Sequence, residues 1–472
     1  MERITLARAL AMGREEARAL DRDSPKGRLR STPPGRDRLF IRAEGCRLWD
    51  DQGQVYLDFA GQGGTLSLGH NPAPVLEAVR LVAERPNLLQ VGLDPVMSAL
   101  MQNLAALAPE ALARPLLTAS GREAIRAAVG LARRATGRPR ILVCEGASSD
   151  LSLDSWAAEP PPAETPTAAA PVAETAATAT SAPPGTGLAA VPYGDLAALE
   201  EALAGREVAA FVVEPIQVEA GVLLPPPGYL QRARTLCRER GTLFIVDERR
   251  TGLGRTGTLF ACQAEGIEPD ILCLGPSLGG GVEPLGAVLT TEALWRQATA
   301  RREGRWIETL LPEVGTRAAA AGLATLESLL DEGLPARAAE LGAYLLARLE
   351  SLQAEHHTVV KAVRGRGFLV GLEFEDVRSW ATRLPFGGRG AFGPGGLATW
   401  VAGELLQRHR MLTHPVQPQV LLLAPPLTIG RNEIDQVVDA LGQVLAGARP
   451  GWSLAVRSAL TGLRHLRGGS PS

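Results

Sequence analysis

Short apolar runs alternate with amphipathic segments through the middle of the chain. Five runs carry almost no polar residues, at 140–144, 209–213, 243–246, 271–274 and 286–290. Runs of this kind are typical of strands that are buried on both faces of a sheet. Segments with apolar residues at helical spacing lie between them, such as 196–204 and 228–241. The alternation predicts an α/β fold built around a parallel sheet.

The same pattern divides the chain into four parts. Residues 1–38 hold a short amphipathic segment and a Pro/Gly/Arg-rich run, which predict a mobile N-terminal arm; packing on a second subunit is the alternative. Residues 39–320 form a predicted large domain, and residues 321–450 a small C-terminal domain. Residues 451–472 form a tail whose apolar stripe predicts a surface helix, with a membrane or partner helix as the alternative.

One segment within the predicted large domain departs from the apolar pattern. Residues 157–190 consist mainly of Ala, Pro, Thr and Glu. Such a composition buries too little apolar surface to offset the entropy lost on ordering. The segment is therefore predicted to be a disordered insert.

Composition excludes several classes of function. The 472 residues carry a formal net charge of −2, and the arginines are interleaved with acids, so we expect no nucleic-acid partner. No apolar run approaches the roughly 20 residues that a membrane span requires. The five cysteines show neither paired nor Cys/His spacing, which predicts reduced thiols, a cytoplasmic location and no metal site.

The basic residues are almost all arginines. Lys26 and Lys361 are the two lysines of the chain. An arginine stays protonated near neutral pH and cannot form a stable imine with an aldehyde. Chemistry that needs a free primary amine on a side chain has only these two candidates.

The stretch 243–281, LFIVDERRTGLGRTGTLFACQAEGIEPDILCLGPSLGGG, joins two apolar runs through a Gly/Arg/Thr loop. It resembles the class-III, ornithine-type aminotransferases, which use pyridoxal phosphate (PLP). Their motif reads D-E-V-Q-T-G-x-G-R-T-G, followed later by K-x-L-G-G-G. Similar patterns follow the family order over residues 39–148 and 190–445, including Glu214-Pro-Ile-Gln-Val-Glu219.

The resemblance implies the PLP-dependent transferase fold of type I. That fold has a large lobe with a mostly parallel, seven-stranded sheet flanked by helices, and a small α+β C-terminal lobe. In the family the lysine of K-x-L-G-G-G forms the imine with PLP. Here the register is unbroken, and Pro276 stands at the lysine position.

Other positions that the resemblance assigns to the cofactor or substrate also differ. The aromatic residue that stacks on the pyridine ring corresponds to Ser148, and the glutamine of D-E-V-Q-T-G to Arg250. The threonine that reaches the phosphate of the neighbouring subunit's cofactor falls at Leu311. The arginine that binds the substrate carboxylate falls at Leu422, which leaves Glu219 without the partner that it has in relatives.

A remnant of the cofactor site is still expected. Asp247 corresponds to the residue that pairs with the pyridine nitrogen, and Ser120-Gly121 with Arg122 to the helix start that holds the phosphate. A buried carboxylate without its cofactor is costly unless it is paired. We therefore expect Arg250 or Arg122 to pair with Asp247.

These differences favour a pseudoenzyme: an aminotransferase-like protein with a degraded site, no catalytic residue and no cofactor. The resemblance implies a homodimer, or a heterodimer with an active aminotransferase paralogue to which this chain would be a structural or regulatory subunit. The first alternative is an enzyme with an altered mechanism, PLP-dependent or not, whose arginines bind a phosphorylated or carboxylated ligand. The second is a small-molecule sensor.

Overall fold

The computed structural model describes residues 4–23, 38–87, 93–109, 111–148, 187–300, 314–376 and 396–447. The chain forms two compact units, which are described separately. One comprises Met1–Pro72 with Ala336–Ser472, and the other Ala73–Pro335. The four-part division drawn from the sequence stays a prediction. The predicted tail, most of the predicted insert, Lys26 and Leu311 lie outside the described residues.

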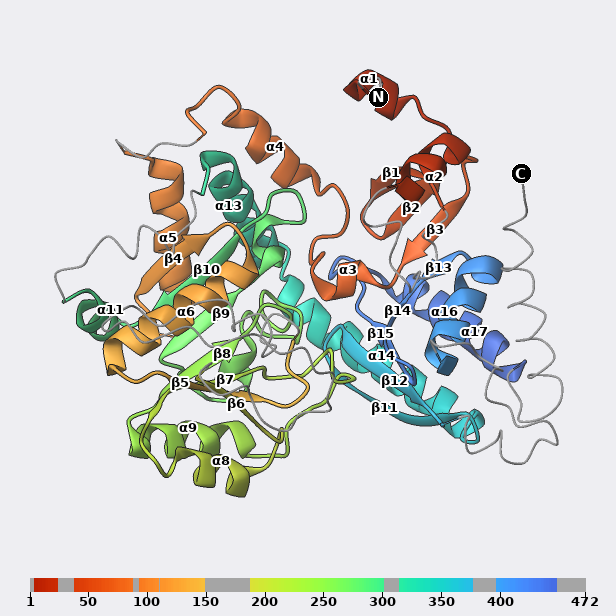
Figure 1. The fold of residues 1–472 in the computed structure, drawn as a ribbon. Coiled ribbons are helices and arrows are strands. Elements are labelled where there is room, and N and C mark those ends of the chain that lie inside the picture. The colour runs from red at the N-terminus through yellow and green to blue at the C-terminus, as the bar shows by residue number, and fades with distance from the viewer. Residues whose placement is uncertain are drawn as a thin grey trace. The chain divides into compact units, whose positions relative to one another are not determined.

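The unit of residues 73–335 is built on a seven-stranded sheet (Figure 1). Its strand order is β4-β10-β9-β8-β7-β5-β6. The strands are β4 (Arg114–Thr118), β5 (Arg140–Cys144), β6 (Leu188–Val191), β7 (Val208–Val213), β8 (Leu243–Asp247), β9 (Ile271–Leu274) and β10 (Gly286–Thr290). Only β10 pairs antiparallel with its neighbours, β9 and β4. The predicted type I fold, with its mostly parallel seven-stranded sheet, is confirmed.

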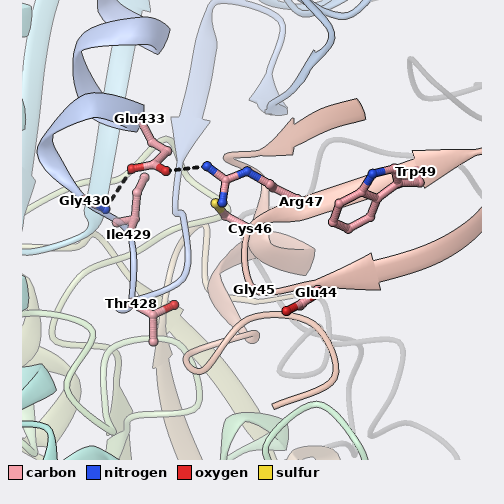
Figure 2. A pocket seen from close by; sticks show the side chains of 9 residues that line it. All are labelled: Glu44, Gly45, Cys46, Arg47, Trp49, Thr428, Ile429, Gly430 and Glu433. Carbon is pink, nitrogen blue, oxygen red and sulfur yellow. Dashed lines mark hydrogen bonds and ion pairs between the residues drawn. The ribbon is translucent and has the colours of Figure 1, made fainter. Parts of the chain in front are cut away.

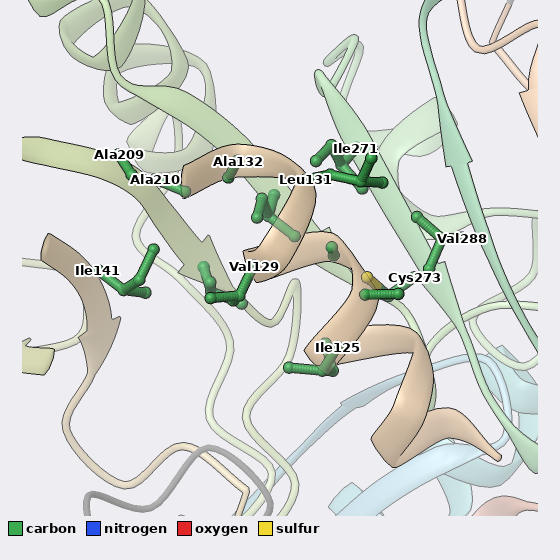
Figure 3. Close-up of a cluster of buried hydrophobic side chains, with 14 of the residues drawn as sticks. Ile125, Val129, Leu131, Ala132, Ile141, Ala209, Ala210, Ile271, Cys273 and Val288 are labelled. Atoms are coloured by element: carbon green, nitrogen blue, oxygen red, sulfur yellow. The ribbon is translucent and has the colours of Figure 1, made fainter. Parts of the chain in front are cut away.

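Helices accompany this sheet. They are α4 (Ala73–Leu81), α5 (Pro95–Leu107), α6 (Gly121–Thr136), α8 (Leu196–Leu203), α9 (Tyr229–Arg240), α10 (Ala261–Ala264), α11 (Glu292–Thr299), α13 (Thr316–Asp331) and the 3₁₀ helix η3 (Pro276–Gly279). Helix α6 lies across the strands and buries the apolar face that the sequence predicts. Figure 3 shows Ile125 and Val129 of α6 in one buried cluster with Ile271, Cys273 and Val288 of the sheet.

The start of α6 is fixed by a side-chain cap. Ser120 has extended backbone angles, and its hydroxyl accepts the backbone N–H of Glu123 at 3.3 Å. We expect Ser120→Ala to lower the free energy of unfolding by about 1 kcal/mol, because one N–H of the first turn loses its partner. Urea denaturation measures this. Asp195→Ala, which removes the corresponding bond to Ala198 on α8, is the matched comparison; no loss in Ser120→Ala alone would contradict the assignment.

The other unit contains two four-stranded sheets. The first pairs β1 (Phe40–Glu44), β2 (Arg47–Asp50), β3 (Val55–Asp58) and β13 (Met411–Leu412); the second pairs β11 (Val360–Arg366), β12 (Leu369–Phe374), β15 (Val420–Leu423) and β14 (His414–Gln417). Its helices are α1 (Leu6–Leu10), α2 (Arg14–Asp23), α3 (Gly61–Gly64), α14 (Leu334–Glu355), α16 (Gly396–His409) and α17 (Arg431–Ala446). Among the described residues, no helix is both long and apolar enough to cross a bilayer.

Candidate functional site

Asp247 ends strand β8, in the middle of the seven-stranded sheet, and is 2% exposed. Its carboxylate accepts four hydrogen bonds from one residue, Arg249, whose Nε–H is shared between the two oxygens. The backbone N–H and Nε of Arg249 lie 3.1 and 2.9 Å from Oδ1, and Nη2 lies 2.8 Å from Oδ2. Both side chains are buried. The structure therefore neutralises Asp247 with a two-pronged arginine bond, the geometry that suits a carboxylate best.

Two glycines leave the space that the Arg249 side chain fills. A Cβ atom on Gly121, the first residue of α6, would lie 2.7 Å from Cδ of Arg249. A Cβ atom on Gly275, which follows β9, would lie 2.7 Å from Cβ of Arg249. Real Cβ contacts are longer than this, so Arg249 fits against α6 and β9 only because both positions are glycine.

Arg249 also reaches the end of strand β5. Its Nη2 donates a hydrogen bond of 3.3 Å to Oγ of Ser148, the residue at the position of the family's stacking aromatic ring. Asp247, Gly121 and Ser148 thus surround a single side chain. The expectation that Arg250 or Arg122 pairs with Asp247 is corrected: Arg249 makes this pair, because it hooks back onto the strand end two residues before it.

Arg250 points to a different acid. Its Nη2 lies 3.0 Å from Oε1 of Glu219, and both side chains are about one-third exposed. Glu219 was expected to lack its partner because Leu422 stands at the position of the family's arginine, and Arg250 supplies that partner. Arg122 is exposed on the first turn of α6. The predicted remnant residues therefore separate into those around Arg249 and the Arg250–Glu219 pair.

Pro276 occupies the first position of η3, directly after Gly275, and is exposed. Proline suits a first helical position, where its missing N–H would have no helical partner. Strands β8 and β9 are parallel neighbours with Asp247 opposite Cys273, so their carboxyl ends lie at the same edge of the sheet. Pro276 thus stands on the loop beside Asp247, and its nitrogen is part of the backbone.

A second buried acid follows strand β7. Glu214 is 3% exposed, and Oε2 has no hydrogen-bond partner within the described part of the chain. Burial, and then the neighbouring Asp247, raise the pKa of Glu214 to about 8, although Arg249 and Arg250 oppose the shift. Glu214 therefore carries a proton near neutral pH. An isolated carboxylate at this depth would be costly, and protonation removes that cost.

The adjacent Glu248 is held differently. Its two carboxylate oxygens accept the backbone N–H groups of Ala261 and Cys262 at the start of α10. Burial raises the pKa of Glu248 to about 7, while these two N–H groups lower it. Glu248 fixes the loop after β8 to α10, which is a structural role.

Among the described residues of the unit 73–335 there is no lysine. Lys361 is on β11, in the other unit, where Nζ lies 2.7 Å from Oε1 of Glu373. Lys26 is outside the described residues. Sequence reasoning missed Arg249, although a signal was present, since Arg249 replaces the valine of D-E-V-Q-T-G and a long cation two residues after a buried aspartate can bend back onto it.

A cavity of about 400 Å³ lies in the unit of residues 1–72 and 336–472. Figure 2 shows its charged pair, in which Nη2 of Arg47 is 2.8 Å from Oε1 of Glu433. The other oxygen of Glu433 accepts the backbone N–H of Gly430 at the start of α17. Burial raises the pKa of the Cys46 thiol beside it, so Cys46 is a poor nucleophile. These side chains stabilise a helix start and form no catalytic group.

Comparison with solved structures gives relatives that match nearly the whole chain. An acetylornithine aminotransferase from Elizabethkingia anophelis is 27% identical, with a TM-score of 0.73 over 92% of this chain and 100% of that chain. An ornithine aminotransferase from Toxoplasma gondii is 28% identical, with a TM-score of 0.75 over 94% of this chain and 98% of that chain. An N-acetylornithine aminotransferase from Stenotrophomonas maltophilia is 25% identical, with a TM-score of 0.70 over 91% and 98%.

The Toxoplasma gondii structure is described as having partial occupancy of PLP at its active site. The expectation that a protein of this kind takes no cofactor is therefore wrong, because a solved relative of the same fold holds PLP at its active site. Two features of that chemistry remain here, the carboxylate of Asp247 for a ring nitrogen and the start of α6 for a phosphate. As the side chains stand they do not fit PLP, because Arg249 already holds Asp247 and Pro276 offers no amine.

The order of the strands in the sheet, the acid at the end of β8 and the glycines after β9 all agree with the fold that the sequence motifs imply. The model of class-III aminotransferases matches residues 34–445. That match covers most of the chain and both of its units. The chain belongs to the class-III aminotransferase family.

Proposed function

We propose that this chain does not catalyse transamination by itself and acts as a structural or regulatory subunit, a pseudoenzyme with the class-III aminotransferase fold. The observation that carries the proposal is Pro276, on the loop beside Asp247, at the position of the family's lysine. Transamination needs a side-chain amine that exchanges the imine and moves a proton. Proline has no such group, and the guanidinium of an arginine does not replace a free amine.

The arrangement of charges supports the same proposal. Arg249 makes four hydrogen bonds to Asp247, and Arg250 pairs with Glu219. Each arginine holds an acid that would otherwise be available to a ligand. Glu214, the third acid near this point, is buried and protonated near neutral pH. The site is therefore internally neutralised and suits a protein that keeps its fold without turning over a substrate.

The proposed partner is a second aminotransferase chain. We expect either a homodimer or a heterodimer with an active paralogue, since family sites form between two subunits. In the heterodimer this chain would complete the site of its partner. The five buried thiols support a reducing, cytoplasmic setting.

Purified protein and PLP test the proposal. The protein is incubated with PLP, then with ornithine or acetylornithine and a 2-oxo acid, and both the imine absorbance and the product are measured. We expect no turnover by this chain alone. A borohydride-trapped PLP adduct on the chain, or product formed by it alone at a rate proportional to its concentration, would overturn the proposal. Turnover that needs a co-expressed paralogue would support the role as a subunit.

A second candidate is a PLP-dependent enzyme with an altered mechanism. It is favoured by the two retained features, the buried carboxylate of Asp247 at the end of β8 and the helix start at Ser120 and Gly121. In that case the amine for imine exchange must come from the substrate. The same assay separates the candidates, because only this one predicts turnover by the purified chain.

A further inference from the structure

Arg249 lies where a ligand of the site would have to bind. Its guanidinium bonds both oxygens of Asp247, and its aliphatic part is enclosed by Gly121 and Gly275. Its Nη2 also reaches Ser148. The three positions that the family gives to the pyridine nitrogen, the phosphate and the stacking ring therefore contact one side chain of the protein itself.

We propose that Arg249 is an internal ligand of this site and sets how tightly the site takes a pyridine phosphate. A protonated ring nitrogen and a guanidinium are both planar cationic donors that pair with a carboxylate. They compete for Asp247, which lies at the buried end of β8. A pyridine phosphate must displace Arg249 before it can bond to Asp247, and the displacement reduces its affinity.

The close packing around Arg249 indicates that a pyridine phosphate competes with this side chain and does not bind beside it. Arg249 is 8% exposed, and Gly121 and Gly275 already lie against its aliphatic part. The side chain could move closer to these glycines only if α6 or the loop after β9 moved as well. Protein interiors are close-packed, so a pyridine ring does not fit beside a side chain that already fills the space. Removing the guanidinium both frees Asp247 and opens the volume above it.

The proposal predicts a gain of binding from a loss of charge. We expect Arg249→Met to bind pyridoxine 5′-phosphate about tenfold or more tightly than the unmodified protein, measured by isothermal titration calorimetry. This probe has the ring and phosphate but no aldehyde, so an imine contributes nothing to the signal. Arg234→Met, which removes a partly buried arginine from Asp270 at the other end of β9, is the matched control and should change the affinity less than about threefold.

A second variant keeps the test decisive if Arg249→Met folds poorly. Asp247→Asn combined with Arg249→Met removes both charges of the pair and leaves no carboxylate at position 247. It should fold and should not show the tenfold gain, because the partner of the ring nitrogen is gone. Equal or weaker binding by Arg249→Met, or an equal gain in the double variant, would overturn the proposal.

The inference rests on the proposed function, since it takes the site as one that is closed by its own residues. The two can fail separately. Turnover by the unmodified chain would overturn the proposed function whatever Arg249→Met does. Unchanged affinity in a folded Arg249→Met would overturn the role of Arg249 and leave the consequence of Pro276 as it was.

Discussion

Arg249→Met lowers the free energy of unfolding by about 3–5 kcal/mol in the protein without added ligand. The cause is Asp247, which is 2% exposed and receives its N–H and guanidinium bonds from Arg249. Methionine replaces the aliphatic part of the arginine and leaves the buried carboxylate of Asp247 unpaired near the buried Glu214. Chemical denaturation followed by circular dichroism measures the loss.

The double variant distinguishes loss of the pair from loss of packing. Asp247→Asn with Arg249→Met replaces both charges, and replacing a whole buried pair costs far less than breaking it. We expect the double variant to regain most of the stability that Arg249→Met loses. Arg250→Met, at the pair with Glu219 in which both side chains are about one-third exposed, should cost less than about 1 kcal/mol. Equal losses in the single and double variants would contradict the assignment.

Glu214→Gln makes the protein more stable at alkaline pH. The pKa of Glu214 is about 8 in the folded protein, against 4.5 for an ordinary glutamate, because the side chain is buried and lies near Asp247. Between these values the folded state binds a proton that the unfolded state has released. The stability of the unmodified protein therefore falls as the pH rises from 4.5 to about 8. Glutamine cannot ionise and escapes this loss.

The difference in unfolding free energy between Glu214→Gln and the unmodified protein should grow as the pH rises. Near pH 4 the two proteins should have similar unfolding free energies, and near pH 9 Glu214→Gln should be more stable by roughly 2–4 kcal/mol. Urea titrations at several pH values measure this. Glu219→Gln, at a half-exposed acid beyond the same strand, is the control and should stay within about 1 kcal/mol throughout. Parallel curves for Glu214→Gln and the unmodified protein would exclude an ionisation at Glu214.

Much of the fold follows from apolar periodicity. The five apolar runs are strands β5, β7, β8, β9 and β10, and the predicted face of α6 is buried against them. Strand β4 was not predicted, since it begins with Arg114-Pro115 at one edge of the sheet and carries few apolar residues. Strand β6 was missed because its Leu-Ala-Ala-Val sequence merges with the Ala-rich composition before it.

The contacts of the site could be predicted from the sequence only in part. The position of Asp247 at a strand end, and the proline at position 276, could be read from the sequence alone. The partner of Asp247 could not, because it depends on which neighbouring arginine has room to bend back. That room is provided by Gly121 and Gly275, which are more than 100 residues apart in the sequence. Side-chain direction after a strand end is decided by such contacts, which no local pattern records.

The buried pair of Asp247 and Arg249 also constrains how the sequence of this chain can evolve. A lineage that acquired lysine at position 276 would gain little while the arginine held the aspartate. A lineage that first lost the arginine would pass through a less stable protein. Recovery of the relatives' arrangement therefore depends on the order of substitutions, and each of the two changes limits the benefit of the other.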